Sequence, residues 1–205
     1  MNWMKSLMSG ICLAAVSVLS AEPTAAEYHF AFGPTSLEAP SGWKRTDGRT
    51  LYNKERGYGW TKEWGRSVTW KSAADPLLQG SIGGDPGVEE GIFIIDLPDG
   101  MYNVTVQLGS ASPTEGRNGN CMEINGKTVI PPPGVGGWGK NVKRTVPAVI
   151  SNRQMKVRLF ISGKGGSFRL NIFSLEITPV DGEAAEKIQK QWNNAGTRDN
   201  NNPNV

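Results

Sequence analysis

Short stretches in which apolar and polar residues alternate run through most of this 205-residue chain. The clearest two flank Asp99-Gly100, a residue pair that suits the central positions of a type I′ turn. The apolar residues pair across that turn as Leu97 with Tyr102, Ile95 with Val104 and Phe93 with Val106. The other face carries polar residues such as Asp96 and Asn103. The pattern therefore predicts a β-hairpin with one buried face and one wetter face.

A second hairpin is predicted nearer the end of the chain, with Lys164-Gly165 as its turn. Its buried face pairs Val157 with Ile172, Leu159 with Leu170 and Ile161 with Phe168. Its other face pairs Arg158 with Asn171 and Phe160 with Arg169, which makes a polar, cationic strip. Beyond Ile172 the apolar phase shifts to Phe173, Leu175 and Ile177. Such a shift indicates a β-bulge or a strand that bends from one sheet toward the other.

Further strands are predicted at residues 28–33, 67–71, 121–130 and 144–150, which brings the total to eight or nine. The segment 121–130 contains a second turn pair, Asn125-Gly126. Long loops rich in glycine and proline separate the strands, at 34–50, 75–91, 110–120 and 131–143. Loops of this length are uncommon in a compact domain unless they have a function. The pattern predicts an all-β fold, a β-sandwich of the jelly-roll type.

The chain divides into three segments. Residues 1–26 are typical of an export signal, because Lys5 precedes a short apolar run at 7–19 and small residues follow it. Residues 27–179 form the predicted sandwich. In 180–205, Asp181 is a candidate N-cap for a helix at 182–194, and a disordered Asn-rich tail follows. That helix, with Ala184, Ile188 and Trp192 on one stripe, either packs on the sandwich or docks a separate catalytic protein. We expect a secreted or periplasmic protein.

Charge and cysteine content narrow the classes of partner. The net charge is +3, and it stays +3 without residues 1–26, which hold one cation, Lys5, and one anion, Glu22. This balance is too mild for a nucleic-acid binder but tolerates an acidic polymer. No segment after residue 26 approaches the roughly 20 apolar residues that span a bilayer, so no membrane partner is expected. With Cys12 inside the signal, Cys121 is the last thiol, and it is expected to be a buried structural residue without a disulfide.

Four ordered motifs carry a resemblance to a known family. They are HFAFG at 29–33, LYNKERGYGW at 51–60, DPLL at 75–78 and IDLPDGMY at 95–102. Together they resemble the galactose-binding-like β-sandwich, the module found at the N-terminus of rhamnogalacturonan acetylesterases and related to malectin-like carbohydrate-binding domains. The resemblance covers residues 28–179. It implies sugar binding, in some members a structural calcium, and in others only a brace for a catalytic domain.

Catalytic motifs are missing from the sequence. It has no Gly-Asp-Ser motif and no Gly-x-Ser-x-Gly elbow, and the only histidine, His29, lies beside the core-forming Phe30. Glu89 and Glu90 are adjacent and would point to opposite faces of a strand, unlike the paired carboxylates of a glycosidase. An enzyme is therefore less expected than a binding module. A carboxylate pair brought together only by the fold stays open as the alternative.

Two tryptophans and several cationic or amide side chains are the candidate ligand-binding residues. Trp138, between glycines, is the first candidate for a flat sugar platform and Trp64 the second, and the alternative for each is packing on the core. Polar groups that could hold sugar hydroxyls or carboxylates come from a loop or from the predicted strip: Arg117, Asn118, Arg158, Arg169 and Asn171. We favour the loop site, because stacking survives salt whereas exposed ion pairs contribute about 0 to 1 kcal/mol.

Calcium is the one cofactor that the sequence suggests. Asp75, Asp85 and Glu89 flank one long loop and could supply hard oxygen ligands, although lone loop carboxylates are usually solvated. The leading hypothesis for function is a secreted module that binds a plant or algal cell-wall polysaccharide without a catalytic site of its own. The alternatives are a stand-alone polysaccharide-acting enzyme and a structural or assembly domain.

Overall fold

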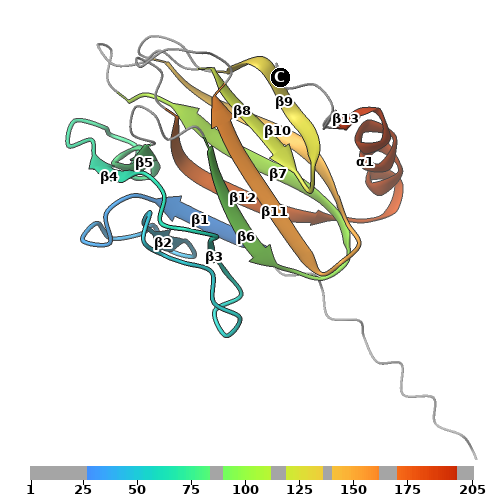
Figure 1. Ribbon diagram of the computed structural model, residues 1–205, viewed down its shortest axis with the longest axis horizontal. Helices are drawn as coiled ribbons and strands as arrows, with labels where there is room; N and C mark the ends of the chain where they lie inside the picture. Colours follow the sequence, from blue (N-terminus) through green and yellow to red (C-terminus); the bar gives the residue numbers. More distant parts are fainter. Residues whose placement is uncertain (1–26, 84–89, 112–118, 136–139, 162–169, 198–205) are drawn as a thin grey trace, which may run out of the picture.

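Two β-sheets face each other across an apolar core (Figure 1). The computed structural model describes residues 27–83, 90–111, 119–135, 140–161 and 170–197. Strands make up most of these residues, and one α-helix, α1 (Gly182–Asn194), lies near the C-terminal end. The predicted all-β sandwich with a C-terminal helix is confirmed.

The first sheet has seven strands. Its main path runs β10 (Asn141–Ile150), β7 (Gly100–Gly109), β12 (Asn171–Val180), β1 (Tyr28–Phe32) and β2 (Lys44–Thr46). β5 (Gly80–Gly83) pairs with β12 and with β4 (Arg66–Thr69), and the short 3-10 helix η1 (Pro76–Leu78) precedes it. All pairings in this sheet are antiparallel except β1 with β2.

The second sheet has six strands, all paired antiparallel. Their order is β13 (Gly196–Thr197), β9 (Lys127–Val135), β8 (Asn120–Ile124), β11 (Gln154–Ile161), β6 (Glu90–Asp96) and β3 (Tyr58–Trp60). The inward faces of both sheets supply the core, whose largest buried side chains are aromatic, including Phe30, Phe93 and Trp60.

Both predicted long hairpins are wrong in their pairing, and the first is right in its buried face. β6 and β7 flank Asp99-Gly100, yet β6 pairs with β11 and β3 while β7 pairs with β10 and β12. β11 and β12 also lie in different sheets. The chain therefore changes sheets between β6 and β7, and again between β11 and β12. The apolar residues assigned to the first hairpin are nevertheless all buried, because in a sandwich they face one another across the core.

Two finer predictions are confirmed. β8 and β9 form a hairpin around Asn125-Gly126, and both residues have the positive φ angles, 47° and 80°, that a type I′ turn requires. β12 changes register against β7 between Ile172 and Ser174, where the apolar phase shifts in the sequence. The predicted cationic strip does not form, because Arg158 lies in the six-stranded sheet and Asn171 in the seven-stranded sheet.

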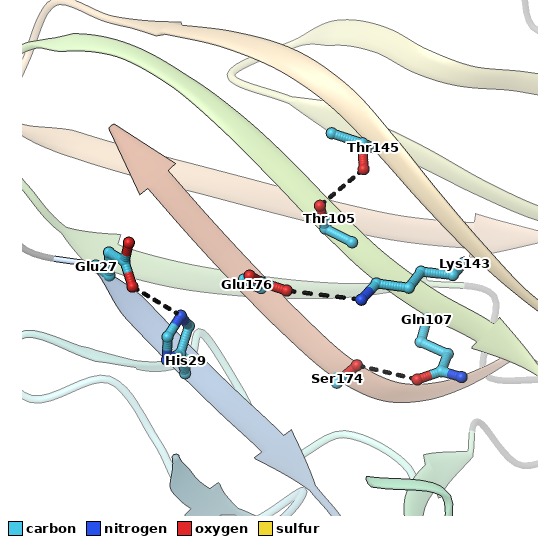
Figure 2. A network of polar contacts seen from close by, with 8 residues as sticks. All are labelled: Glu27, His29, Thr105, Gln107, Lys143, Thr145, Ser174 and Glu176. Atoms are coloured by element: carbon cyan, nitrogen blue, oxygen red, sulfur yellow. Dashed lines mark hydrogen bonds and ion pairs between the residues drawn. The ribbon is translucent and has the colours of Figure 1, made fainter. Parts of the chain in front are cut away.

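The outer face of the seven-stranded sheet is polar, and its side chains bind one another (Figure 2). The hydroxyls of Thr105 and Thr145 lie 2.8 Å apart, and the Ser174 hydroxyl donates to Gln107 Oε1 at 3.4 Å. An ion pair flanks them, Lys143 Nζ with Glu176 Oε2 at 3.8 Å, and His29 Nε2 lies 3.5 Å from Glu27 Oε2. The His29 ring also stacks on Trp43. Many polar side chains on this face therefore already bind one another.

The C-terminal helix packs on the sandwich, which is one of the two alternatives predicted for it. α1 packs on β10 and β7 and buries Ile188 and Trp192, while Ala184 stays exposed. Asp181 occupies the N-cap position, but its side chain makes no cap hydrogen bond. Lys127 Nζ donates to the Trp192 carbonyl at 2.8 Å, near the end of the helix where a cation is favourable.

After the helix, β13 pairs with β9, so the segment joins the two sheets at one edge (Figure 1). Part of what the sequence assigns to the tail is thus a strand. Within the described ranges, no helix is long and apolar enough to cross a membrane. The predicted export signal, residues 1–26, lies outside those ranges.

Cys121 is fully buried on β8, and its thiol donates to the Gly119 carbonyl at 3.4 Å. Cys121→Ser keeps a donor for that carbonyl and loses only local packing, so we expect it to lower the free energy of unfolding by about 1 to 2 kcal/mol. Denaturant unfolding monitored by tryptophan fluorescence measures the change. Failure of the variant to fold would contradict a purely packing role for this thiol.

Candidate functional site

An open cleft of about 880 Å³ lies at one end of the sandwich. β6 ends there and β9 and β11 begin there, and the β8–β9 and β10–β11 turns supply its rim. The helix α1 adds one wall through Trp192. The lining residues are Tyr52, Lys54, Asp96, Asn125, Lys127, Val149, Ser151, Asn152, Arg153, Gln154, Lys156 and Trp192. Ten of these twelve residues carry polar or charged side chains.

A hydrogen-bonded row of three side chains lies in the cleft. The Tyr52 hydroxyl donates to Asp96 Oδ2 at 2.9 Å, and Gln154 Nε2 donates to Asp96 Oδ1 at 2.9 Å. Asp96 and Gln154 are opposite each other in the β6–β11 pairing, and the Asp96 amide donates to the Gly57 carbonyl at 2.7 Å. Both carboxylate oxygens are thus held in place. The row presents a fixed aromatic ring, an amide and a carboxylate to the cleft.

The hydrogen bond to Asp96 is the main cause that raises the pKa of the Tyr52 hydroxyl above 10.0. Desolvation and the charge of Asp96 raise that pKa further. A raised tyrosine pKa means that the contribution of this contact is fully present below pH 10, and is lost only as the pH rises through the raised value. Tyr52 is therefore a proton donor throughout the neutral range.

Two turn residues with positive φ shape the rim of the cleft. Asn125 has φ 47°; its Oδ1 accepts from the Lys156 amide at 2.8 Å and its Nδ2 donates to the Gln154 carbonyl at 3.2 Å. Arg153 has φ 51°, a conformation unusual for arginine. The Arg153 amide donates to Asp99 Oδ1 at 2.6 Å, and its carbonyl accepts from the Leu97 amide at 3.2 Å. The β10–β11 turn is therefore fixed to the β6–β7 turn.

Cations outnumber anions in the cleft: Lys54, Lys127, Arg153 and Lys156 against Asp96 alone. Lys127 is engaged, since its Nζ binds the Trp192 carbonyl and lies 5.2 Å from the centre of the Trp192 ring. Lys54, Arg153 and Lys156 are exposed, and within the described part of the chain none of their side chains forms an ion pair. The cleft thus has a local positive charge.

The structure does not support Trp64 as a sugar platform. Its side chain is 1% exposed, 4.6 Å from the Trp60 ring, and lies against Gly91 on β6. The alternative weighed for Trp64, packing on the core, is the one observed. Asn171 is also buried, and its backbone N–H donates to Asn120 Oδ1 at 3.3 Å. Neither residue is available to a ligand.

Arg158 is engaged in ion pairs on the six-stranded sheet. Its Nε lies 2.7 Å from Glu90 Oε2 and its Nη1 lies 3.0 Å from Glu123 Oε1. The guanidinium also lies 4.4 Å from the centre of the Phe160 ring. The fold thus brings together two carboxylates that are distant in sequence, as the enzyme alternative requires. One guanidinium bridges them, however, which is the arrangement of a brace and not of a separated acid and base.

The other predicted site residues, Trp138, Arg117, Asn118, Arg169, Asp85 and Glu89, lie outside the described ranges. The strand ends next to them, such as Val135, Ile161 and Glu90, are at the end of the sandwich opposite the cleft. Asp75 caps η1, because its Oδ1 accepts from the Leu77 amide at 2.9 Å. Among the described residues, no group of three or more His, Cys, Asp or Glu could hold a metal ion. Calcium binding by Asp75, Asp85 and Glu89 stays a prediction.

Comparison with solved structures identifies proteins of similar fold. The protein YXIM from Bacillus subtilis has a TM-score of 0.58 at 22% identity, over 76% of this chain and 40% of that one. The ANX2 ectodomain from Arabidopsis thaliana has a TM-score of 0.51 at 11% identity, over 78% and 52%. A β-glucuronidase from Bacteroides uniformis has a TM-score of 0.50 at 17% identity, over 76% and 18%.

This chain therefore spans about half of the length of these proteins, or less. At these identities the likeness shows a common β-sandwich fold. No protein-family model matches the sequence, and a search of curated proteins found no significant match.

Proposed function

We propose that this chain is a non-catalytic module that binds a polysaccharide in the end cleft. The observation that carries the proposal is the Tyr52–Asp96–Gln154 row, in which a half-exposed aromatic ring is fixed beside planar polar groups. Sugars bind proteins by stacking on such rings while amides and carboxylates bind their hydroxyls. The fold is compatible with the proposal, because this chain shares it with the ectodomain of the plant receptor-like kinase ANX2 and with a part of a β-glucuronidase.

Secretion belongs to the same proposal. Residues 1–26 have the sequence of an export signal, and cell-wall polysaccharides are found outside the cell. A non-catalytic role agrees with the bridged arrangement of Glu90 and Glu123 around Arg158. It also agrees with a cleft whose single carboxylate, Asp96, already accepts two hydrogen bonds.

A glycan panel tests the proposal. Affinity gels containing pectic and other plant or algal polysaccharides measure binding, while release of reducing ends or acetate measures turnover. We expect retardation in at least one gel and no turnover. Tyr52→Ala should weaken that binding about two- to tenfold, since a ring contact is worth about 0.5 to 1.5 kcal/mol. Tyr52→Phe keeps the ring and should lose less.

The alternative binding site is the loop that contains Trp138, and Trp138→Ala is the variant that tests it. Val135, the described residue that precedes the Trp138 loop, lies at the end of the sandwich opposite the cleft. Each variant tests one of the two candidate residues. Normal binding by Tyr52→Ala together with lost binding by Trp138→Ala would move the ligand to the loops. Turnover of any polysaccharide in the panel would replace the binding module with an enzyme.

A further inference from the structure

The cleft has a positive charge, which the binding of a neutral sugar does not require. Lys54 comes from the loop before β3, Arg153 from the β10–β11 turn and Lys156 from β11, so three separate elements direct cations to one cleft. Asp96 is the only carboxylate in the lining, and both its oxygens already accept hydrogen bonds. In the part of the chain that the structure describes, no carboxylate pairs with the three cationic side chains. A negatively charged ligand would supply the missing partners.

Arg153 gives the second, independent observation. Its φ of 51° lies in the left-handed region, where glycine and asparagine are favoured and a long side chain is strained. Strained backbone often persists where a side chain serves a function. An arginine at this position costs stability and places a guanidinium at the rim of the cleft.

We propose that the cleft selects an anionic polysaccharide, whose charges are uronate carboxylates or sulfate esters. This inference rests on the proposed function and names the class of its ligand. The Tyr52–Asp96–Gln154 row binds the ring and hydroxyls of one sugar, and Lys54, Arg153 and Lys156 bind the acidic groups around it. Arginine suits this task, because its planar guanidinium makes two parallel hydrogen bonds with one carboxylate or sulfate group.

Paired polymers test the inference. We expect the protein to bind polygalacturonate or carrageenan about tenfold more tightly than carboxyl-reduced polygalacturonate or desulfated carrageenan, respectively, since three exposed ion pairs each contribute a few tenths to one kcal/mol. The preference should vanish between about 0.01 M and about 1 M salt, as the Debye length falls from about 30 to about 3 Å. The two acidic polymers distinguish carboxylate from sulfate recognition.

Three variants separate a ligand role from a structural one. Lys54→Gln and Lys156→Gln should each weaken binding of the preferred acidic polymer about two- to fivefold. Arg153→Gly should weaken it similarly while the melting temperature stays level or rises, because glycine relieves the left-handed strain. Lys71→Gln, an exposed cation outside the cleft, is the matched control and should bind like wild type.

Equal binding of the charged and neutral polymers would overturn the inference and leave the proposed function standing. The same holds if the three variants bind like wild type, or if Lys71→Gln loses as much as they do. A melting temperature lowered by Arg153→Gly would assign that arginine to stability. If no polysaccharide binds at all, the proposed function itself fails.

Discussion

Arg158→Met should lower the free energy of unfolding by about 3 to 5 kcal/mol, because it leaves a buried carboxylate without its partner. The side chain of Glu123 is 6% exposed and that of Arg158 is 18% exposed, so water does little to replace the lost pair. Glu90 loses the same guanidinium but is 39% exposed, which limits its share of the cost. Denaturant unfolding of the variant and the wild type measures the difference.

The double variant Arg158→Met with Glu123→Gln removes both charges and should recover part of the loss, since the buried carboxylate is gone. Lys143→Met is the matched control on the other sheet. It breaks the ion pair between Lys143, whose side chain is 63% exposed, and Glu176, whose side chain is 33% exposed. The free energy of unfolding should fall by about 0 to 1 kcal/mol. A loss from Arg158→Met no larger than that of the control would show that the Glu90–Arg158–Glu123 contact is not a brace.

Gly91→Ala should also destabilise the fold strongly. A Cβ at this position would lie 2.4 Å from Trp64 Cδ2, in a part of the core where two tryptophan rings are 4.6 Å apart. Overpacking of this kind costs about 1 to 3 kcal/mol or more. Trp64→Ala removes the same contact from the other side and should cost about 3 to 5 kcal/mol through the cavity that it leaves.

Because the two residues share one contact, the costs of Gly91→Ala and Trp64→Ala should not add, and the double variant should be more stable than their sum predicts. Gly196→Ala is the matched control, since nothing lies within 4 Å of its added Cβ, and unfolding should change by less than about 0.5 kcal/mol. Trp64→Phe should keep glycan binding while it remains folded. Additive costs, or loss of binding by folded Trp64→Phe, would contradict the core role of Trp64.

The sequence by itself determined features that depend on a few neighbouring residues. These include the buried side of the strands on either side of Asp99-Gly100, the turn at Asn125-Gly126, the bulge after Ile172 and the helix at 182–194. Each follows from local torsion preferences or from the two- or 3.6-residue period of the apolar residues. It also indicated the sandwich, because many short strands with one apolar face can be buried only against another sheet.

Only the tertiary structure decided which strands pair and where the candidate site lies. Alternation gives the same buried face whether the next strand joins the same sheet or crosses the core, so the hairpins at Asp99-Gly100 and Lys164-Gly165 could not be distinguished from crossings. Tyr52 and Gln154 are 44 and 58 residues from Asp96, and neither stands out in the sequence as a ligand residue. Trp64, in contrast, stood out as a ligand candidate, and its burial against Gly91 on another strand is visible only in the tertiary structure. Such contacts arise from packing between segments distant in the chain, which local sequence patterns do not encode.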